Sequence, residues 1–287
     1  MRLAHSETTP WTPVPPLRGG TIEFKTLLEG REGAPDNYQL LIANTDTSFQ
    51  SPRHRHNFDQ LRHPLEGATN FGPKRNLDEG DLAYFPEGTY YGPQVQQEVG
   101  HTSLAMVVQF GGPCGNGYMS RQQMQDGFTK LSAVGKFEAG VFKRATPAPE
   151  GRINQDAYEA IWEHQNGRPV SYSKPRFLDP VHFREQNFDW QPAASEAGVA
   201  TKHIGSFTEK GIHVVFLQLQ PGAIHTLPPA KQIQILFIKD GTGSLGTGVP
   251  WFRHSAIELA PGEPATLVAT TLTEVLALAL EAATICS

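Results

Sequence analysis

Residues 51–67 read SPRHRHNFDQLRHPLEG, with His54 and His56 one residue apart and Gln60 four residues after the second histidine. On a β-strand alternate side chains share a face, so the two imidazoles would point to the same side. If that side is a sheltered barrel interior, the rings converge as a divalent transition metal requires. The other interpretation is an exposed basic loop, because arginines flank the pair.

The composition indicates a globular protein that does not bind nucleic acid. The chain has 287 residues, of which 38% are hydrophobic and 18% are charged, with 28 glycines and 23 prolines. That many turn formers favour short strands over long helices. A formal net charge of −5 gives no basic footprint for DNA or RNA. The most apolar stretch, ATLVATTLTEVLALAL, is interrupted by polar residues and predicts buried strands, so we expect no membrane partner.

Cysteine usage and the N-terminus predict a cytoplasmic location. The two cysteines, Cys114 and Cys286, lie far apart in the sequence and do not suggest a disulfide framework. The N-terminal stretch MRLAHSETTPWTPVPP has no apolar run of the kind that a signal peptide contains. We therefore expect a reducing, cytoplasmic environment.

The chain divides into three parts by pattern. Residues 1–112 and 199–287 consist of short strand-like runs between turn residues, as in GTIEFKTLLEG and HVVFLQLQPG. Residues 113–198 contain two candidate helices, SRQQMQDGFTKLSAVG and NQDAYEAIWEHQNG. Many closely spaced short strands favour a sandwich or barrel. We predict an all-β dominated fold: an N-terminal barrel, a connecting segment with short helices and a C-terminal barrel.

The two strand-rich parts share a pattern. QLRHPLEGATNFG at 60–72 aligns with QILFIKDGTGSLG at 234–246, with glutamine on glutamine and glycine on glycine. We interpret this as two copies of one β-unit, with a chance match between amphipathic strands as the alternative.

These residues resemble the cupin superfamily, and the whole chain resembles a bicupin. The first cupin motif is His-x-His-x-x-x-Glu on a strand that ends in glycine, and the second is Gly-x5-Pro-x-Gly-x-x-His. The framework positions of both motifs match, at Gly67, Gly80, Pro86 and Gly88. Two ligand positions differ, because Gln60 replaces the glutamate and Tyr91 replaces the last histidine.

The resemblance implies two double-stranded β-helix (jelly-roll) barrels and a metal centre in the first one. Its expected cofactor is one divalent transition metal, iron, zinc, nickel or manganese, held by His54, His56 and Gln60. Asp59, next to the motif position, is the alternative carboxylate. Two histidines and a neutral amide leave the metal its full charge, which favours Lewis-acid chemistry over oxygen activation.

Two further side chains are candidate catalytic residues. Tyr91 could ligate the metal or donate a hydrogen bond to bound water or substrate. Arg62 follows Gln60 by two residues and should face the same interior, where it would pair with a substrate carboxylate or phenolate. The alternative for Arg62 is a salt bridge to an interior acid. His101 has the wrong spacing for the motif, and we expect it on the surface.

The second copy lacks the histidine pair, because Pro228 and Ala230 stand where the two ligands would be. A single upstream histidine cannot hold a metal, so we expect a metal-free barrel with a structural role. A second, purely organic pocket is the alternative.

The expected function is a metal-dependent cupin enzyme acting on a small carbonyl, enol or phenol substrate, dioxygenase-like by analogy. The alternatives are a Lewis-acid cyclase or isomerase and a non-catalytic binding or storage bicupin. A small molecule is the expected partner, and a homodimer is left open.

Overall fold

The computed structural model describes residues 1–15, 17–34, 36–112, 114, 118–149, 151–207 and 212–280, so Cys286 lies outside the described residues. The chain forms two compact units. The first barrel unit comprises residues 11–182, and the second barrel unit comprises residues 1–10 together with 183–280. The predicted connecting segment 113–198 is thus divided between the units, and the N-terminal residues join the second one.

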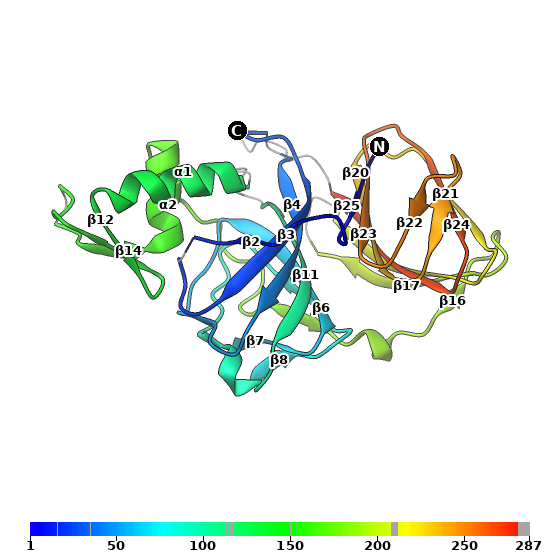
Figure 1. Ribbon diagram of the computed structural model, residues 1–287, viewed down its shortest axis with the longest axis horizontal. Coiled ribbons are helices and arrows are strands. Elements are labelled where there is room, and N and C mark those ends of the chain that lie inside the picture. Colours follow the sequence, from blue (N-terminus) through cyan, green and yellow to red (C-terminus); the bar gives the residue numbers. More distant parts are fainter. Residues whose placement is uncertain are drawn as a thin grey trace. The chain divides into compact units, whose positions relative to one another are not determined.

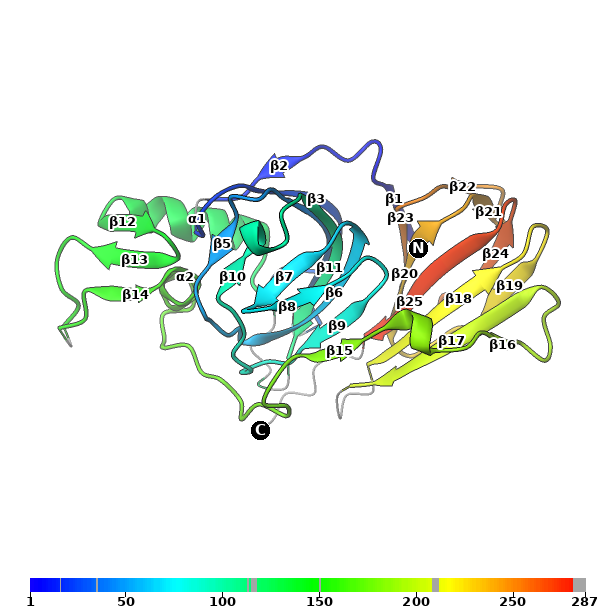
Figure 2. The same ribbon diagram turned by 90° about the horizontal axis from the view of Figure 1, so that it is seen from below.

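A large antiparallel sheet forms the framework of the first barrel unit (Figure 1). Its described strands follow the order β15 (Val181–Phe183), β9 (Leu82–Phe85), β6 (Phe58–Glu66), β11 (Ser103–Gly111), β4 (Tyr38–Thr45), β3 (Ile22–Glu29) and β2 (Thr12–Pro13). Two short sheets complete the barrel: β10 (Gln94–Val95) with β5 (Gln50–Ser51), and β7 (Thr69–Gly72) with β8 (Arg75–Leu77). Figure 2 shows these strands curving around one interior.

The second barrel unit repeats this strand order. Its large sheet follows β1 (Arg2–His5), β23 (Ser255–Leu259), β20 (Ile233–Asp240), β25 (Thr273–Leu280), β18 (His213–Leu219), β17 (Val199–Ser206) and β16 (Gln191–Pro192). Its smaller sheet follows β19 (Ile224–Leu227), β24 (Ala265–Ala269), β21 (Gly243–Leu245) and β22 (Pro250–Trp251). Both barrels are antiparallel, and the all-β dominated prediction is confirmed.

Backbone register confirms the predicted repeat at a constant offset of 174 residues, as from Gln60 to Gln234. The amide of Gly88 donates to the carbonyl of His56 at 2.9 Å, and the amide of Gly262 donates to the carbonyl of Ala230 at 2.8 Å. Both glycines have positive φ, 76° and 84°, a conformation that favours glycine. Ala230 therefore holds the backbone position of His56 in the second barrel.

A helical insertion belongs to the first barrel unit (Figure 1). It contains α1 (Arg121–Ser132), α2 (Ala157–Asn166) and a small sheet of β12 (Gly135–Glu138), β13 (Val141–Arg144) and β14 (Asn154–Asp156). Ser120 and Gln123 form a capping box at the start of α1, and Asp156 caps α2 through the amides of Tyr158 and Glu159. The described residues also form two 3₁₀ helices: η1 (Gln96–Glu98) in the first barrel unit and η2 (Glu185–Asn187) in the second. No helix among the described residues is long and apolar enough to cross a membrane.

The interiors of the two barrels differ. Leu236, Ile238, Trp251, Ile257 and Leu267 are each at most 1% exposed and belong to one continuous apolar core in the second barrel. The corresponding face of the first barrel carries polar side chains among apolar ones and surrounds a cavity. Only the first barrel therefore offers a described interior site.

Candidate functional site

The cavity inside the first barrel has a volume of about 370 Å³. Strand alternation decides what lines it: on β6 the side chains of Phe58, Gln60 and Arg62 share the interior face. The register places Gln60 opposite Gln109 and Arg62 opposite Val107 on β11. The predicted interior positions of Gln60 and Arg62 agree with this arrangement.

His54 and Tyr91 are held together by their backbones. The two residues form an isolated antiparallel bridge in which each amide donates to the other's carbonyl at 3.0 Å. The two cupin motifs, distant in sequence, thereby bring an imidazole and a phenol to the same point, with their ring centroids 4.4 Å apart. His56 lies beside them, its ring centroid 4.9 Å from that of His54.

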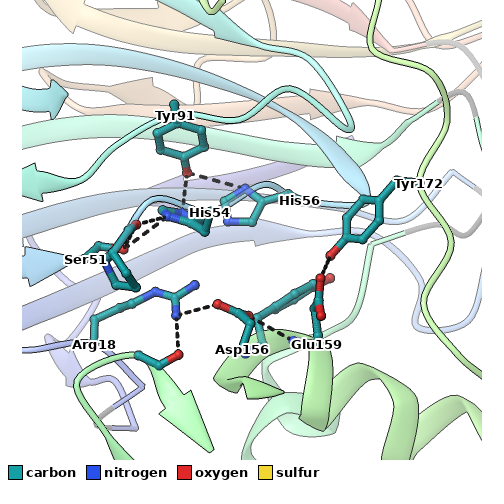
Figure 3. Close-up of polar contacts among 11 residues, drawn as sticks. Arg18, Ser51, His54, His56, Tyr91, Asp156, Glu159 and Tyr172 are labelled. Carbon is teal, nitrogen blue, oxygen red and sulfur yellow. Dashed lines mark hydrogen bonds and ion pairs between the residues drawn. The ribbon is translucent and has the colours of Figure 1, made fainter. Parts of the chain in front are cut away.

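A continuous hydrogen-bonded chain runs through these side chains (Figure 3). His54 Nδ1 lies 2.7 Å from the carbonyl oxygen of Pro52, which can only accept, so Nδ1 carries the proton and donates. His54 Nε2 is then an acceptor, and the Tyr91 hydroxyl donates to it at 3.0 Å. Arg62 Nη2 in turn donates to the Tyr91 oxygen at 2.8 Å.

Arg62 also holds Gln60. Its Nε donates to Gln60 Oε1 at 2.7 Å, and its guanidinium lies over the rings of Phe85 and Tyr91 at 4.5 and 5.1 Å. Among the residues that the structure describes, no carboxylate lies within ion-pair distance of Arg62. The described residues therefore do not form the alternative contact, a salt bridge between Arg62 and an interior acid.

His56 presents an unused nitrogen to the cavity. Its ring stacks on Phe58 with centroids 4.3 Å apart and planes 11° apart. Its Nδ1 lies 3.5 Å from the Tyr91 hydroxyl, at the long limit of a hydrogen bond. Within the described part of the chain, Nε2 has no hydrogen-bond partner.

Burial and positive charge keep both histidines neutral. Burial is the main cause that lowers the pKa of His54 well below its usual value, and the charge of Arg18 adds to it. Burial likewise lowers the pKa of His56, followed by the neighbouring His54 and by Arg18. Burial raises the pKa of Tyr91, although Arg62 opposes this. At neutral pH the site therefore contains two neutral imidazoles, a protonated phenol and a guanidinium cation.

Sequence reasoning missed the residues that reach the cavity from outside the two motifs. Arg18 lines it and donates through Nη1 to Asp156 Oδ2 and to the carbonyl of Gly140, both at 3.3 Å (Figure 3). Tyr118, Met124 and Tyr158 line it from the insertion. The aromatic residues of the insertion were visible in the sequence, but no spacing connected them to the histidines.

The donor set as it stands does not fit a divalent cation. The oxygens of Gln60, an expected ligand, and of Tyr91, a candidate catalytic residue, both accept from Arg62, so a cation already lies beside them. The lone pair of His54 Nε2 accepts from Tyr91. A metal ion there would meet the guanidinium charge at close range. The described residues also contain no group of three histidine, cysteine, aspartate or glutamate side chains that could hold a metal.

Asp59, the alternative carboxylate ligand, lies away from the cavity. It is fully buried on the opposite face of β6, where its Oδ1 accepts from the amide of Glu87 at 2.6 Å. Because alternate residues of a strand face opposite sides, Asp59 cannot share a face with Gln60. His101 is exposed and its Nδ1 bonds the carbonyl of Thr102 at 2.9 Å, as expected of a surface residue.

Comparison with solved structures identifies the fold. A protein of Nostoc punctiforme proposed to be a dioxygenase matches at TM-score 0.65 and 10% identity, covering 98% of this chain and 82% of that one. Oxalate decarboxylase of Bacillus subtilis matches at 0.56 and 12%, covering 99% and 77%. The chain has the bicupin fold. Bacterial pirin of Escherichia coli in complex with nickel(II) matches at 0.55 and 9%, covering 98% of both chains.

At these identities the likeness of this bicupin to the solved structures shows the fold alone. No family model matches its sequence, and no curated protein does. Its function therefore has to be argued from the site itself.

Proposed function

We propose that the first barrel is a metal-independent enzyme site that holds a small organic molecule by an oxygen atom and transfers a proton on it. The substrate class is a carbonyl, enol or phenol compound, and the reaction is of the isomerase or cyclase kind. The observation that carries the proposal is the chain from Arg62 through Tyr91 to His54, beside a free nitrogen of His56.

Arg62 supplies the electrostatic part of this chemistry. Arg62 lines the cavity, and its Nη1 has no partner among the described residues, while Nε and Nη2 are fixed by Gln60 and Tyr91. A guanidinium held in place stabilises negative charge that develops on a substrate oxygen, without reorganising during the reaction. Tyr91 acts here as a positioning residue, because its hydroxyl joins Arg62 to His54 and holds both side chains in place.

His56 supplies the base. Its imidazole is neutral at neutral pH and lines the same cavity as Arg62. The Tyr91 hydroxyl donates its hydrogen bond to His54, so the contact of His56 Nδ1 with the Tyr91 oxygen puts the proton on Nδ1 and leaves Nε2 as the base. A neutral imidazole that faces an apolar cavity can take a proton from a carbon or hydroxyl next to the stabilised oxygen. Loss of one proton and its return at a second atom isomerises the substrate and needs no external oxidant.

A metal-dependent oxygenase, with His54, His56 and Gln60 as ligands, is the second candidate. The neutral state of both imidazoles favours it, because only a neutral imidazole has a lone pair for a metal. Structural neighbours include proteins with bound nickel(II) and with Mn(II) centres. For this chain the oxygenase would require Arg62 to leave Gln60 and Tyr91. A non-catalytic binding barrel is the third reading.

Two measurements on untagged protein test the proposal. Elemental analysis is expected to show substoichiometric transition metal, and chelation is expected to leave activity unchanged. Incubation in D₂O with small ketones, β-diketones and phenols should give deuterium uptake that NMR detects, and His56→Ala should abolish it. The control His101→Ala, at an exposed histidine, should retain it. Stoichiometric metal that disappears in His54→Ala and His56→Ala would overturn the proposal, and absence of exchange would favour a binding barrel.

A further inference from the structure

We infer that the molecule held in the first barrel is a small, flat monocarboxylate whose carboxylate pairs with Arg62. This inference rests on the proposed function, because it names the substrate class of the same cavity. It also accounts for the positive charge of Arg62, which no carboxylate among the described residues neutralises.

Arg62 is the unneutralised charge of the cavity. Buried charges cost stability unless they are paired, and no described carboxylate lies within ion-pair distance of this guanidinium. Glu23 borders the cavity, but it alternates on β3 with Ile22 and Phe24, so its side chain takes the other face. A carboxylate on Nη1 would supply the missing charge with the strong hydrogen bond that a guanidinium forms to an anion.

Arg18 limits the ligand to a single negative charge. It is the second guanidinium that lines the cavity, with a side chain 15% exposed, and Asp156 already neutralises it at 3.3 Å. The cavity therefore offers one free positive charge. A dicarboxylate would leave its second carboxylate among apolar side chains or would have to displace Asp156 from Arg18.

The walls favour a flat apolar body. Phe24, Leu41, Ala43 and Val107 form one apolar cluster that lines the cavity. Phe58 and Tyr158, with ring centroids 5.7 Å apart, line it as well. A volume of about 370 Å³ lies at the small end of ligand pockets, which suits a single ring with its substituents.

Benzoate and benzamide form a matched pair that tests the charge, because they share a shape. Isothermal titration of the full chain is expected to show benzoate binding at least about tenfold more tightly than benzamide. Arg62→Gln should bring the two affinities together while benzamide still binds, which shows that the cavity has kept its shape. Arg75→Gln, whose guanidinium pairs with Asp179 at 2.8 Å outside the cavity, should leave the preference intact.

The three benzenedicarboxylates test the limit to one charge. Wild-type protein is expected to bind each of them at least about tenfold more weakly than benzoate. Asp156→Asn frees Arg18 while asparagine still caps α2, so the affinity for at least one dicarboxylate should rise about tenfold or more. Benzoate affinity should change much less.

The outcomes separate this inference from the proposed function. Equal binding of benzoate and benzamide, no binding of either, or a preference that persists in Arg62→Gln would overturn the inference, even if deuterium exchange is observed. A benzoate preference that depends on Arg62, found without any deuterium exchange, would support the inference and contradict the proposed proton transfer. Unchanged dicarboxylate affinity in Asp156→Asn would overturn the role of Arg18.

Discussion

The two barrels of this bicupin share a strand order and differ in what fills them. At the offset of 174 residues, Arg62 corresponds to Leu236, His56 to Ala230 and Tyr91 to Ala265. Leu236 is 1% exposed inside a continuous apolar core, whereas Arg62 faces a cavity. The same framework thus supports a packed interior in one copy and, in the other, a hollow interior that contains a few polar side chains.

The shared positions are those that set the backbone. Gly67 and Gly241 have φ values of 71° and 98°, and Gly88 and Gly262 make the same backbone hydrogen bond in the two copies. These turns need a residue that tolerates positive φ, whatever the interior contains. The interior side chains are free to change, so they differ with the use of each barrel: packing in the second and, as we propose, a reaction site in the first.

Leu236→Arg imposes the first barrel's charge on the second, and we expect the largest effect from it. The described core around Leu236 is packed with apolar side chains and would leave the guanidinium buried without a partner. The second barrel should therefore lose at least about 5 kcal/mol of stability and fail to fold. Leu236→Met, which nearly conserves volume, should cost less than about 1.5 kcal/mol. Chemical denaturation followed by circular dichroism checks both, and a stable Leu236→Arg protein would contradict the packed interior.

Asp59→Asn tests a pH-dependent contribution to stability. The second barrel lacks this contribution, since the corresponding residue there is Ile233. Burial raises the pKa of Asp59 from 3.8 to about 7. The folded protein thus binds this proton more tightly than the unfolded chain. Its stabilising effect is full below pH about 4 and is lost as the pH rises to about 7, at most about 4 kcal/mol.

We therefore expect the wild-type protein to lose stability between about pH 4 and pH 7 and Asp59→Asn to lose much less. Urea denaturation at a series of pH values measures this difference. Asp46→Asn, at an exposed carboxylate whose pKa is lowered, is the control and should not flatten the profile. A wild-type profile that is already flat would show that Asp59 keeps an ordinary pKa.

Tyr91→Phe removes the hydroxyl that joins Arg62 to His54. His54 Nε2 and Arg62 Nη2 each lose a buried partner, so the first barrel should lose about 1–3 kcal/mol. Thermal denaturation measures the loss. NMR of the imidazole nitrogens should show the His54 Nε2 resonance shift when it loses its donor, while the Pro52 carbonyl keeps the proton on Nδ1. A His54 Nε2 resonance that does not move would contradict the positioning role of Tyr91.

Ser120→Ala loosens the insertion, which only the first barrel unit contains among the described residues. Loss of the capping box should cost about 1 kcal/mol locally. Hydrogen exchange of α1 is expected to accelerate while exchange in β18 and β25 stays unchanged. Faster exchange in both barrel units would show that the cap serves the whole chain.

The sequence was sufficient for the bicupin fold and for the direction of several side chains. Strand alternation alone placed Gln60 and Arg62 on one face, and the glycine framework gave the repeat that the structure confirms. The glycine framework also located the second copy, in which Ala230 holds the backbone position that His56 holds in the first. These features are local, or they repeat at a fixed offset, so the order of residues is enough to find them.

The contents of the site were harder to predict because they depend on long-range contacts. No pattern linked Arg18 to Asp156, residues far apart in the sequence that the fold brings to one cavity. Motif position predicted Gln60 as a metal ligand and Tyr91 as a ligand or a hydrogen-bond donor, but Arg62 donates to both of their oxygens. A motif predicts the backbone position of a side chain, whereas the residues around that side chain determine what it binds.

The central claim, that Arg62 and its hydrogen-bonded neighbours replace a metal centre, is tested most directly by measuring carboxylate binding before and after metal removal. Benzoate should bind chelator-treated protein with the affinity that it has for untreated protein. Arg62→Gln should lose that affinity in both preparations. Binding that vanishes on chelation and returns when iron, manganese, nickel or zinc is added would contradict the account.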